Sequence, residues 1–498
     1  MPASSERSTL RPRIGLFTGF ALLLACLVFA PPAGLSPAGW RTAGVGLLMA
    51  VWWMSEAVPI AVTSLVPLLA FPLLGIAKAD AAAAPYANPL IFLFLGGFLI
   101  ALAMQRWGLH RRIALAIIRG VGTRPTRIIA GFMLASAFLS MWISNTATAM
   151  MMLPIGLSVV ELVVKGGDPR GAAGGGGALP AKGTPGGHFA LDLMLGIAYA
   201  SSIGGLATLI GSPPNALLAA FMDKTYGVEV GFLEWMSVGL PLAIVGLAGA
   251  FLVLTRFAYP VRLREIPGGA ELLRREVERM GPISKQERRV AVVFTLTAAL
   301  WITRPLVARL LPGLTDTGVA IFGALLLFLL PADWSEGEAL LDWPSARKVP
   351  WGVLLLFGGG LSLAGAVAGT GLAGWIGERM HGAAAWPVVL IAALTVTVIV
   401  LLTELTSNTA TAATFLPVVG SVAVGLGEAP LFLVLPAALA ASCAFMMPVA
   451  TPPNAIVYGS GYVTIPQMVQ AGIWLNLLFI VLLTAAAFTL IPWAASWS

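Results

Sequence analysis

The sequence predicts an all-helical protein that crosses a membrane many times. Of its 498 residues, 58% are hydrophobic and only 10% are charged, whereas soluble domains carry about 25% charged residues. Apolar runs of roughly 20 residues, the length that spans a bilayer, recur along the whole chain. The composition therefore excludes a soluble enzyme, a nucleic-acid-binding protein and a disordered scaffold.

The apolar runs have a clear order along the chain. They cover residues 14–31, 42–56, 58–77, 89–105, 128–160, 189–221, 237–258, 290–311, 317–331, 350–369, 385–425, 431–461 and 468–493. Two of them, 128–160 and 385–425, are long and carry a polar cluster near the middle. Each of these two is either one overlong span or a hairpin that enters and leaves on the same side.

The distribution of basic residues predicts the orientation. Lys and Arg concentrate at 1–13, 106–127 and 256–289, while the connection 222–236 is mostly acidic. If the two long runs are hairpins, all three basic stretches lie on one side, which should be the cytoplasmic side. This arrangement predicts eleven spans in the cell (inner) membrane, with the N-terminus inside and the C-terminus outside. No A-x-A cleavage site follows the first apolar run, so we interpret that run as the first span.

Two hydrophilic segments interrupt the apolar pattern. The stretch 165–188 is rich in glycine and is expected to be a flexible linker. The stretch 262–289 is the only long hydrophilic helix candidate. The two cysteines lie in apolar runs and the three histidines in or beside polar connections, so neither a disulfide framework nor a metal cluster is expected.

The chain contains an internal repeat. Ser-Asn-Thr-Ala-Thr-Ala at 144–149 recurs 263 positions later at 407–412. Ser-Pro-Pro-Asn at 212–215 recurs 239 positions later as Thr-Pro-Pro-Asn at 451–454. The difference of 24 between the two offsets (263 − 239) matches the length of the glycine-rich stretch, which exists only in the first half. Chance does not easily produce such collinear motifs, so the two halves share one architecture.

The predicted topology makes the two halves inverted. Five predicted spans separate the two copies of Ser-Asn-Thr, and an odd number places the copies on opposite sides of the membrane. Inverted repeats with interrupted helices at corresponding positions are typical of secondary transporters. The predicted organisation is an N-terminal span at 1–40, a first repeat at 41–260, a cytoplasmic amphipathic linker at 261–289 and a second repeat at 290–498.

Each repeat carries two polar motifs that are suited to ending a helix inside the membrane. Ser-Asn-Thr supplies good N-cap residues before a helix-forming stretch, and paired prolines cannot continue the helix that precedes them. Interhelical hydrogen bonding and a simple proline kink are the ordinary alternatives, but repetition at equivalent positions favours a binding site. Unsatisfied backbone at this depth must line protein or a water-filled cavity, so the four motifs should meet around one site.

The predicted site offers hydroxyls, amides, N–H groups and carbonyls, but no Lys, Arg or His. Oxygen-rich, uncharged coordination suits a hard cation such as Na+, while hydroxyls and helix N-termini suit a carboxylate. A dianion there needs neutralising charge, which bound cations supply, so binding of the two should be coupled. Among the carboxylates, Glu404 is expected to have a structural role within its hairpin and Glu56 a structural role at the inner face.

These motifs closely resemble those of the divalent anion/sodium symporter family, bacterial relatives of the mammalian sodium-dicarboxylate and sodium-citrate carriers. The resemblance runs from WWMSEAVPIAVTSLVPLLAFPLLGI, which begins at Trp52, to ATPPNAIVYGSG, which ends at Gly461. It implies eleven spans plus two re-entrant hairpins at 128–160 and 385–425, broken helices at 189–221 and 431–461, and a homodimer. It also implies elevator-type movement of a transport domain against a scaffold domain.

The resemblance further implies at least two Na+ sites and a substrate site. One Na+ site would use Ser140, Ser144, Asn145 and the Gly211 carbonyl, and the other Thr403, Ser407, Asn408 and the Ala450 carbonyl. Ser140 and Thr403 are again 263 positions apart, so the repeat supports their pairing independently. The implied substrate contacts are Ser144, Asn145, Thr146, Ser212, Pro213, Ser407, Asn408, Thr409, Thr451 and Pro452.

The expected function is Na+-coupled import of C4-dicarboxylates such as succinate, fumarate or malate. A Na+-independent exchanger of dicarboxylates or 2-oxoglutarate, and a sulfate, citrate or tartrate carrier of the same family, stay open as alternatives. An enzyme is not expected, because no catalytic Asp pair, Ser–His pair or zinc motif stands at membrane depth in the sequence. The expected partners are a small dianionic carboxylate, Na+, the lipid bilayer and a second copy of the chain, and not nucleic acid.

Overall fold

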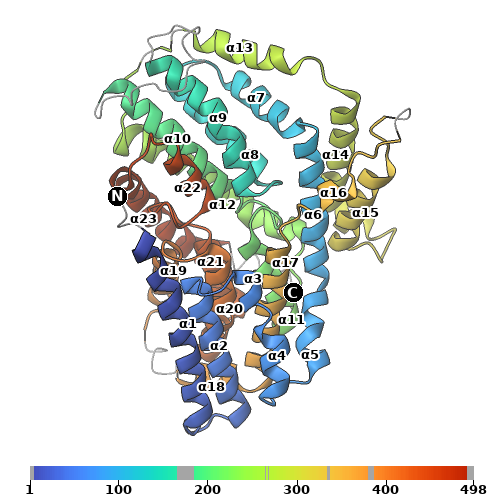
Figure 1. Cartoon of the computed structure of the whole chain (residues 1–498), viewed down its shortest axis with the longest axis vertical. Coiled ribbons are helices and arrows are strands. Elements are labelled where there is room, and N and C mark those ends of the chain that lie inside the picture. The colour runs from blue at the N-terminus through green and yellow to red at the C-terminus, as the bar shows by residue number, and fades with distance from the viewer. Residues whose placement is uncertain are drawn as a thin grey trace.

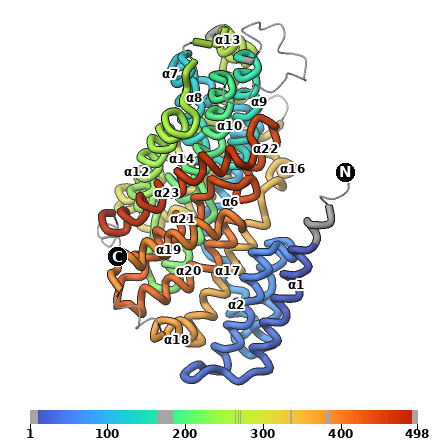
Figure 2. The backbone as a smooth tube through the Cα atoms, turned by 90° about the vertical axis from the view of Figure 1, so that its left-hand side faces the viewer, coloured from blue at the N-terminus to red at the C-terminus, as the bar shows by residue number. Residues whose placement is uncertain are grey.

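The computed structural model describes residues 5–164, 184–263, 265–266, 268–333, 337–379 and 386–490. These residues form helices joined by loops, with one isolated antiparallel bridge between Pro331 and Ala339, so the all-helical class is confirmed for them. The molecule is elongated, with α7 and α13 at one end and α18 and the α1–α2 connection at the other (Figure 1). Figure 2 shows the same order from the side.

The first half of the chain runs from α1 to the π-helix η3. Its elements are α1 (Ser5–Val28), α2 (Pro37–Ser55), α3 (Ile60–Thr63), α4 (Val66–Leu73), α5 (Ala79–Ala83), the 3-10 helix η1 (Ala84–Ala87), α6 (Pro89–Arg106), α7 (Leu109–Val121), α8 (Pro125–Ser140), α9 (Asn145–Val164), α10 (Pro185–Gly204), α11 (Pro213–Tyr226), α12 (Phe232–Leu252) and η3 (Val253–Ala258). Many of these helices begin with proline, whose fixed φ and missing N–H suit the first helical turn.

The rest of the chain comprises a short connecting helix, α13, and the second half. Its elements are α13 (Gly269–Met280), α14 (Lys285–Val307), α15 (Asp316–Leu329), α16 (Trp343–Ala346), α17 (Trp351–Gly369), α18 (Leu372–Arg379), α19 (Val388–Thr403), α20 (Asn408–Gly425), α21 (Pro430–Ala441), α22 (Pro452–Gly459) and α23 (Ile465–Thr489). The helices α8 to α12 of the first half therefore have counterparts in α19 to α23 of the second.

Membrane-spanning character is distributed along the whole chain. Eight helical segments of the described residues are long and apolar enough to cross a membrane: Leu10–Val28, Ala79–Arg106, Asn145–Val163, Phe232–Ala258, Lys285–Val307, Trp351–Gly369, Asn408–Gly425 and Ile465–Thr489. Five shorter apolar helices accompany them: Ile60–Leu73, Pro125–Ser140, Asp316–Leu329, Val388–Thr403 and Pro430–Ala441. The protein is thus a polytopic membrane protein.

Both long apolar runs fold as pairs of helices and not as single overlong spans. The first pair, α8 and α9, is joined by a non-helical tip at 141–144, and the second, α19 and α20, by a tip at 404–407. In each pair the two helices pack against each other. The polar cluster therefore stands at a hairpin tip in both halves, as the sequence predicts.

Both paired-proline motifs interrupt a helix, also as predicted. Helix α10 ends at Gly204 and α11 begins at Pro213, while α21 ends at Ala441 and α22 begins at Pro452. The halves interlock around these breaks, because α22 packs against α9 and α10, and α11 packs against α20 and α21. Tips and breaks of both repeats consequently meet in one region of the molecule.

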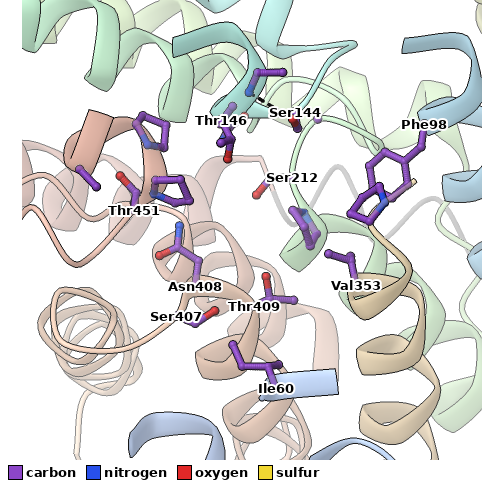
Figure 3. Close-up of a pocket in the computed structure, with 18 of the residues that line it drawn as sticks. Ile60, Phe98, Ser144, Thr146, Ser212, Val353, Ser407, Asn408, Thr409 and Thr451 are labelled. Atoms are coloured by element: carbon purple, nitrogen blue, oxygen red, sulfur yellow. Dashed lines mark hydrogen bonds between the residues drawn. The ribbon is translucent and has the colours of Figure 1, made fainter. Parts of the chain in front are cut away.

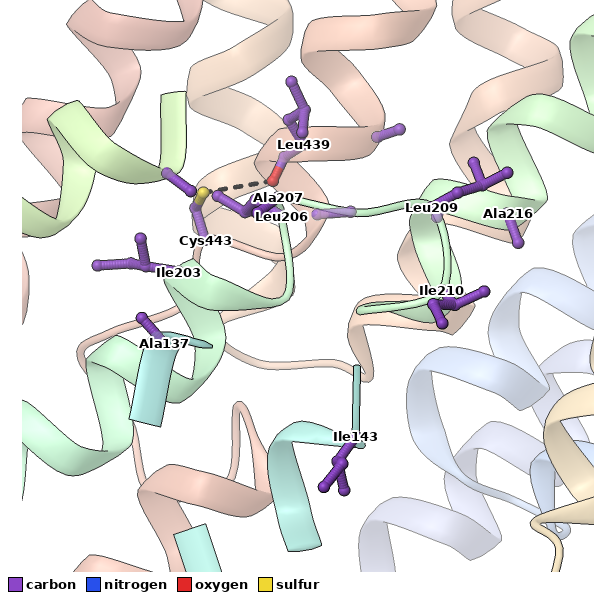
Figure 4. Packing of buried hydrophobic residues seen from close by; sticks show 14 of the residues in the cluster. Ala137, Ile143, Ile203, Leu206, Ala207, Leu209, Ile210, Ala216, Leu439 and Cys443 are labelled. Carbon is purple, nitrogen blue, oxygen red and sulfur yellow. Dashed lines mark hydrogen bonds between the residues drawn. The ribbon is translucent and has the colours of Figure 1, made fainter. Parts of the chain in front are cut away.

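Buried apolar side chains pack against the tips and breaks. Ile203 and Leu206 around the first break are buried and lie near Leu439 and Cys443 of the second half (Figure 4). Ile143 of the first tip and Ile210 belong to the same buried apolar cluster. The Cys443 thiol donates to the Leu439 carbonyl at 3.3 Å, which is a helix-internal bond. Apolar packing thus holds the non-helical segments in place where lipid cannot satisfy their backbone.

The connection between the halves differs in detail from the prediction. The hydrophilic helix expected over 262–289 is restricted to α13, because Gly281, with a positive φ of 62°, ends it. A capping box between Ser284 and Glu287 then starts α14 at Lys285, so the predicted boundary at 289 falls inside α14. Similarly, the boundary at 40 falls inside α2, which begins at Pro37. Most of the glycine-rich stretch, 165–183, lies outside the described residues.

Candidate functional site

A cavity of about 710 Å³ opens between the hairpin tips, the helix breaks and a facing wall of helices (Figure 3). All ten predicted substrate contacts line it: Ser144, Asn145, Thr146, Ser212, Pro213, Ser407, Asn408, Thr409, Thr451 and Pro452. Gly211 and Ala450, whose carbonyls were assigned to the Na+ sites, line it too. The sequence therefore identifies the polar residues on one side of the cavity, where Ala147, Ile210, Pro448, Val449, Pro453 and Ala455 of the same elements complete the lining.

The first tip gathers oxygen atoms around Asn145. The Asn145 side-chain amide lies 2.5 Å from the Ser140 hydroxyl, and 3.2 and 3.3 Å from the carbonyl oxygens of Ser201 and Gly211. Because those carbonyls only accept hydrogen bonds, the amide nitrogen faces them. Glycine at 205 permits this packing, since a Cβ there would lie 2.7 and 3.0 Å from the two terminal atoms of the Asn145 amide. The Ser140 hydroxyl and the carbonyls of Ser201 and Gly211 thus converge on this amide behind the cavity wall.

The second tip repeats this arrangement with Thr403 and Asn408. Thr403 Oγ1 donates to Asn408 Oδ1 at 2.8 Å and lies 2.7 Å from the carbonyl oxygen of Ala441. Ser140 and Thr403 are both fully buried and do not themselves line the cavity. Each therefore contacts the cavity wall through the asparagine of its own tip.

The helix breaks are held open by a second pair of asparagines. Asn215 Nδ2 donates to the carbonyls of Gly205 and Thr208, both at 2.8 Å. Asn454 Nδ2 donates to the carbonyls of Ala444 and Met447, both at 3.1 Å. Each amide thus donates to two carbonyls of the non-helical segment that joins the two helices of its break.

The two breaks also touch each other across the repeat. The hydroxyls of Ser212 and Ser442 lie 3.1 Å apart, and both residues are buried. Thr451, the N-cap of α22, accepts a hydrogen bond from the Asn454 N–H at 3.3 Å, whereas Ser212 makes no cap bond with its side chain. The first half has Ser212 where the second half has Thr451. The Ser212 hydroxyl, which makes no cap bond, contacts Ser442 of the other repeat instead.

Glu404 is a structural residue, but its partners lie outside its own hairpin. Its carboxylate accepts N–H bonds from Phe445, Met446 and Met447 in the second break, at 2.6 to 3.0 Å. The Asn476 amide of α23 donates to it at 2.8 Å. The carboxylate therefore anchors the tip of the second hairpin to the adjacent helix break.

The facing wall of the cavity was not identified from the sequence. It comprises mostly apolar residues of α3, α6 and α17, together with Glu56, Gln105 and Lys348. The four motifs contain no basic residue, as the sequence shows, but Lys348 lines the facing wall. One signal was present: Glu56 and Lys348 each stand shortly before a Val-Pro pair that precedes a helix.

Comparison with known proteins identifies the family. The family model described as "Sodium:sulfate symporter transmembrane region" matches residues 13–497. The chain is 41% identical to the sodium-dependent dicarboxylate transporter SdcS of Staphylococcus saprophyticus over 96% of this chain and 91% of that protein. It is 40% identical to SdcS of Staphylococcus aureus strain USA300 with the same coverage.

Two solved structures share the fold at low sequence identity. One is the YdaH transporter of Alcanivorax borkumensis, with a TM-score of 0.55 and 14% identity, covering 83% of this chain and 87% of that chain. The other is MtrF of Neisseria gonorrhoeae, with a TM-score of 0.53 and 12% identity, covering 96% and 95%. These likenesses concern the fold, whereas the sequence matches cover nearly the whole chain. The protein therefore belongs to the sodium:sulfate symporter family, the divalent anion/sodium symporters, which are membrane transporters and not enzymes.

Proposed function

We propose that the protein imports C4-dicarboxylates such as succinate, fumarate or malate across the bacterial cell membrane together with Na+. One observation carries this proposal: four interrupted elements from two repeats line a single cavity with hydroxyls, amides and backbone groups and with no basic side chain of their own. The carboxylates of the substrate would contact both Ser-Asn-Thr tips and both paired-proline breaks. The names of the 40–41% identical relatives support the ion and the substrate class.

The two tips are the proposed Na+ sites. One ion would be held by Ser140, Ser144, Asn145 and the Gly211 carbonyl, the other by Thr403, Ser407, Asn408 and the Ala450 carbonyl. The convergence of Ser140, Asn145 and Gly211 within 2.5 to 3.3 Å supports the first set. Two cations at symmetry-related positions would neutralise a dianion, so neither ligand would enter the low-dielectric site comfortably alone.

Transport by an elevator movement is the proposed mechanism. The cavity separates a polar wall, made of the tips and breaks, from a mostly apolar wall made of α2–α3, α6 and the α16–α17 segment. At one contact between the two sides, a Cβ on Gly360 of α17 would lie 3.4 Å from Leu217 of α11 and 3.5 Å from Ala413 of α20. A glycine of α17 at this contact would let α11 and α20 slide past it with fewer interlocking side chains.

The remaining parts of the proposal concern topology and assembly. We assign eleven spans and two re-entrant hairpins, with the N-terminus cytoplasmic, the C-terminus external and two copies forming a homodimer. The repeats would be 41–260 and 290–498, with the linker 261–289 in the cytoplasm. The separation of the two hairpins as α8–α9 and α19–α20 supports this count.

Uptake of radiolabelled succinate into proteoliposomes tests the proposed function. We expect uptake under an inward Na+ gradient and very little when choline replaces Na+. Unlabelled succinate, fumarate and malate should compete, while sulfate, citrate, tartrate and 2-oxoglutarate should compete weakly. Strong competition by sulfate or citrate, with none by fumarate, would assign the protein to one of the other substrates of its family.

A further inference from the structure

The two walls of the cavity differ in their charge. The wall formed by the tips and breaks contains no ionisable side chain, whereas the facing wall carries one acid, Glu56, and one base, Lys348. Both side chains are exposed. Neither makes a side-chain hydrogen bond or an ion pair with any residue in the described part of the chain. Two charges of opposite sign, both uncompensated, therefore face the neutral side of the cavity.

Glu56 occupies a backbone conformation that a glycine would adopt more easily. It follows the last residue of α2 with a φ of 52°, and it is the only residue other than glycine with a positive φ in the described segments. For an L-residue the left-handed region costs roughly 1 kcal/mol. Strain of this kind concentrates at functional positions, where the side chain is retained despite the backbone. A glutamate at this strained cap points to a role for its carboxylate.

Lys348 stands on an ordered loop, and the nearby Arg106 is neutralised by acidic residues of that loop. Arg106, at the end of α6, forms ion pairs with Glu338 and with Asp342, the latter at 3.1 Å. Asp342 also caps α16 by accepting the Ser345 N–H at 2.8 Å. The Lys348 N–H then donates to the Ser345 carbonyl at 3.1 Å, so the loop is ordered up to the lysine. Among the described residues that line the cavity, Lys348 is the one basic side chain.

The two charged residues belong to neighbouring elements. Glu56 precedes α3 and Lys348 precedes α17, and these helices pack against each other. A Cβ on Gly352 would lie 3.4 Å from the Cβ of Ala61, which places the starts of the two helices in contact. The acid and the base therefore stand on the same rim of the cavity. We name Glu56 and Lys348 the charged rim.

We propose that the charged rim recruits both ligands to the cavity, with Lys348 attracting the dianion and Glu56 attracting Na+ before the tips bind them. This inference rests on the proposed function. Exposed charges beside a binding site raise the local concentration of oppositely charged ligands and thereby the rate of association. The ligands then move to the tips, whose cavity-lining residues carry no fixed charge that would retain one ligand without the other.

Binding of radiolabelled succinate to the purified full-length protein tests the role of Lys348. At fixed Na+ and low ionic strength, Lys348→Gln should raise the Kd about three- to tenfold, mainly through slower association. With choline chloride at about 1 M, where the Debye length is about 3 Å, variant and wild type should agree within about twofold. Lys348→Arg should restore the wild-type Kd. Lys285→Gln, which removes an exposed lysine outside the cavity, is the matched control and should have no effect.

Two substitutions of Glu56 separate its charge from its backbone strain. Glu56→Gln should raise the Na+ concentration for half-maximal succinate binding about threefold, with little change at saturating Na+. Glu56→Gly removes the charge and the strain together, so it should raise the apparent melting temperature and keep the same Na+ defect. Glu265→Gln, at an exposed acid on the connection before α13, is the matched control. A purely structural Glu56 would give a Glu56→Gly variant with wild-type Na+ dependence.

The outcomes distinguish the charged rim from the function on which it rests. Wild-type protein that binds no succinate in Na+ would overturn both. Wild-type protein that binds succinate, with a Lys348→Gln variant of equal Kd at low ionic strength, would overturn the charged rim alone. A raised Kd that persists at high ionic strength would also contradict it, because a loss of local structure is not screened by salt.

Discussion

The two repeats break a helix at equivalent positions but stabilise the break differently. In the second half one buried carboxylate, Glu404, accepts hydrogen bonds from three successive backbone N–H groups and from the Asn476 amide. In the first half the equivalent position is Met141 (404 − 263), which has no such acceptor. There the Met141 carbonyl accepts the Thr208 hydroxyl instead. Tip and break are thus linked by a carboxylate that accepts backbone N–H groups in one half, and by a hydroxyl that donates to a backbone carbonyl in the other.

This difference shows which parts of the repeat are tied to the ligands. The tip asparagines, the break asparagines and the hydroxyls before each tip are matched between the halves in position, and the break asparagines are matched in bonding too. The residues that brace the breaks from behind are not matched. The residues that line the cavity are therefore equivalent in the two halves, whereas the residues that hold the breaks in place are not. This is the pattern expected if function requires two equivalent cation sites.

The largest expected difference between the halves is their sidedness. In intact cells, a membrane-impermeant thiol reagent should label Leu426→Cys, beyond the second hairpin, and should not label Arg279→Cys in α13. The reason is that inverted repeats place the two hairpin bases on opposite sides, with the basic linker inside. The native cysteines, Cys26 and Cys443, are buried and should contribute little background. Labelling of position 279 from outside would reverse the assigned orientation.

Substitution of the tip asparagine should reduce transport strongly and to the same extent in both halves. Asn145→Ala and Asn408→Ala should each abolish Na+-driven succinate uptake while the protein remains folded. Loss of a buried polar partner costs on the order of 1–3 kcal/mol, more for a charged ligand, so affinity should fall tenfold or more. Ser158→Ala, on α9 but outside the cavity, is the control and should transport normally. Near-normal uptake in either asparagine variant would reduce Ser-Asn-Thr to a packing motif.

Substitutions of the residues that link tip and break should lower stability by different amounts in the two halves. Glu404→Gln places an amide NH2 group against backbone N–H donors and removes the charge they stabilise, so it should cost on the order of 3 kcal/mol. Thr208→Val in the first half removes one neutral hydrogen bond and should cost about 1 kcal/mol. Apparent melting temperatures of the purified variants in detergent provide the measurement. Equal losses would show that the carboxylate is no more important than the hydroxyl.

The smallest expected difference concerns the break asparagines. Asn215→Ala and Asn454→Ala each remove an amide that donates to two carbonyls, with bonds of 2.8 Å and 3.1 Å respectively. Their losses of stability should therefore agree within about 1 kcal/mol, since each variant leaves the same groups unsatisfied. The same melting experiment measures both. A difference of several kcal/mol would mean that the halves depend on their breaks to different extents.

The sequence predicted those parts of the fold that repetition makes visible. Hydropathy identified the polytopic class, and the two offsets of 263 and 239 identified the hairpin tips and helix breaks, which line the cavity as expected. Asn145 and Asn408 were identified because their motif occurs twice at equivalent positions. A polar residue that occurs only once gives no such signal. The apolar run that begins at 290 lies inside a longer helix, because a capping box, Ser284 with Glu287, starts α14 at Lys285.

The facing wall could not be predicted by the same reasoning. Its residues come from α2–α3, α6 and the α16–α17 segment, which meet only in the folded protein. Glu56 was assigned a structural role because it stands between two predicted spans at the inner face. Its positive φ, which marks it as unusual, is a property of the backbone and not of the sequence. The partners of Glu404 were missed for a similar reason, since they lie 41 to 72 positions away.

Net uptake into vesicles that contain no dicarboxylate tests the central claim most directly. The claim is that two equivalent tips without fixed positive charge bind a dianion only together with Na+. Purified protein in such vesicles should accumulate succinate under an inward Na+ gradient, with an initial rate that rises sigmoidally with external Na+. Uptake that requires internal dicarboxylate and does not respond to Na+ would contradict the claim and identify an exchanger.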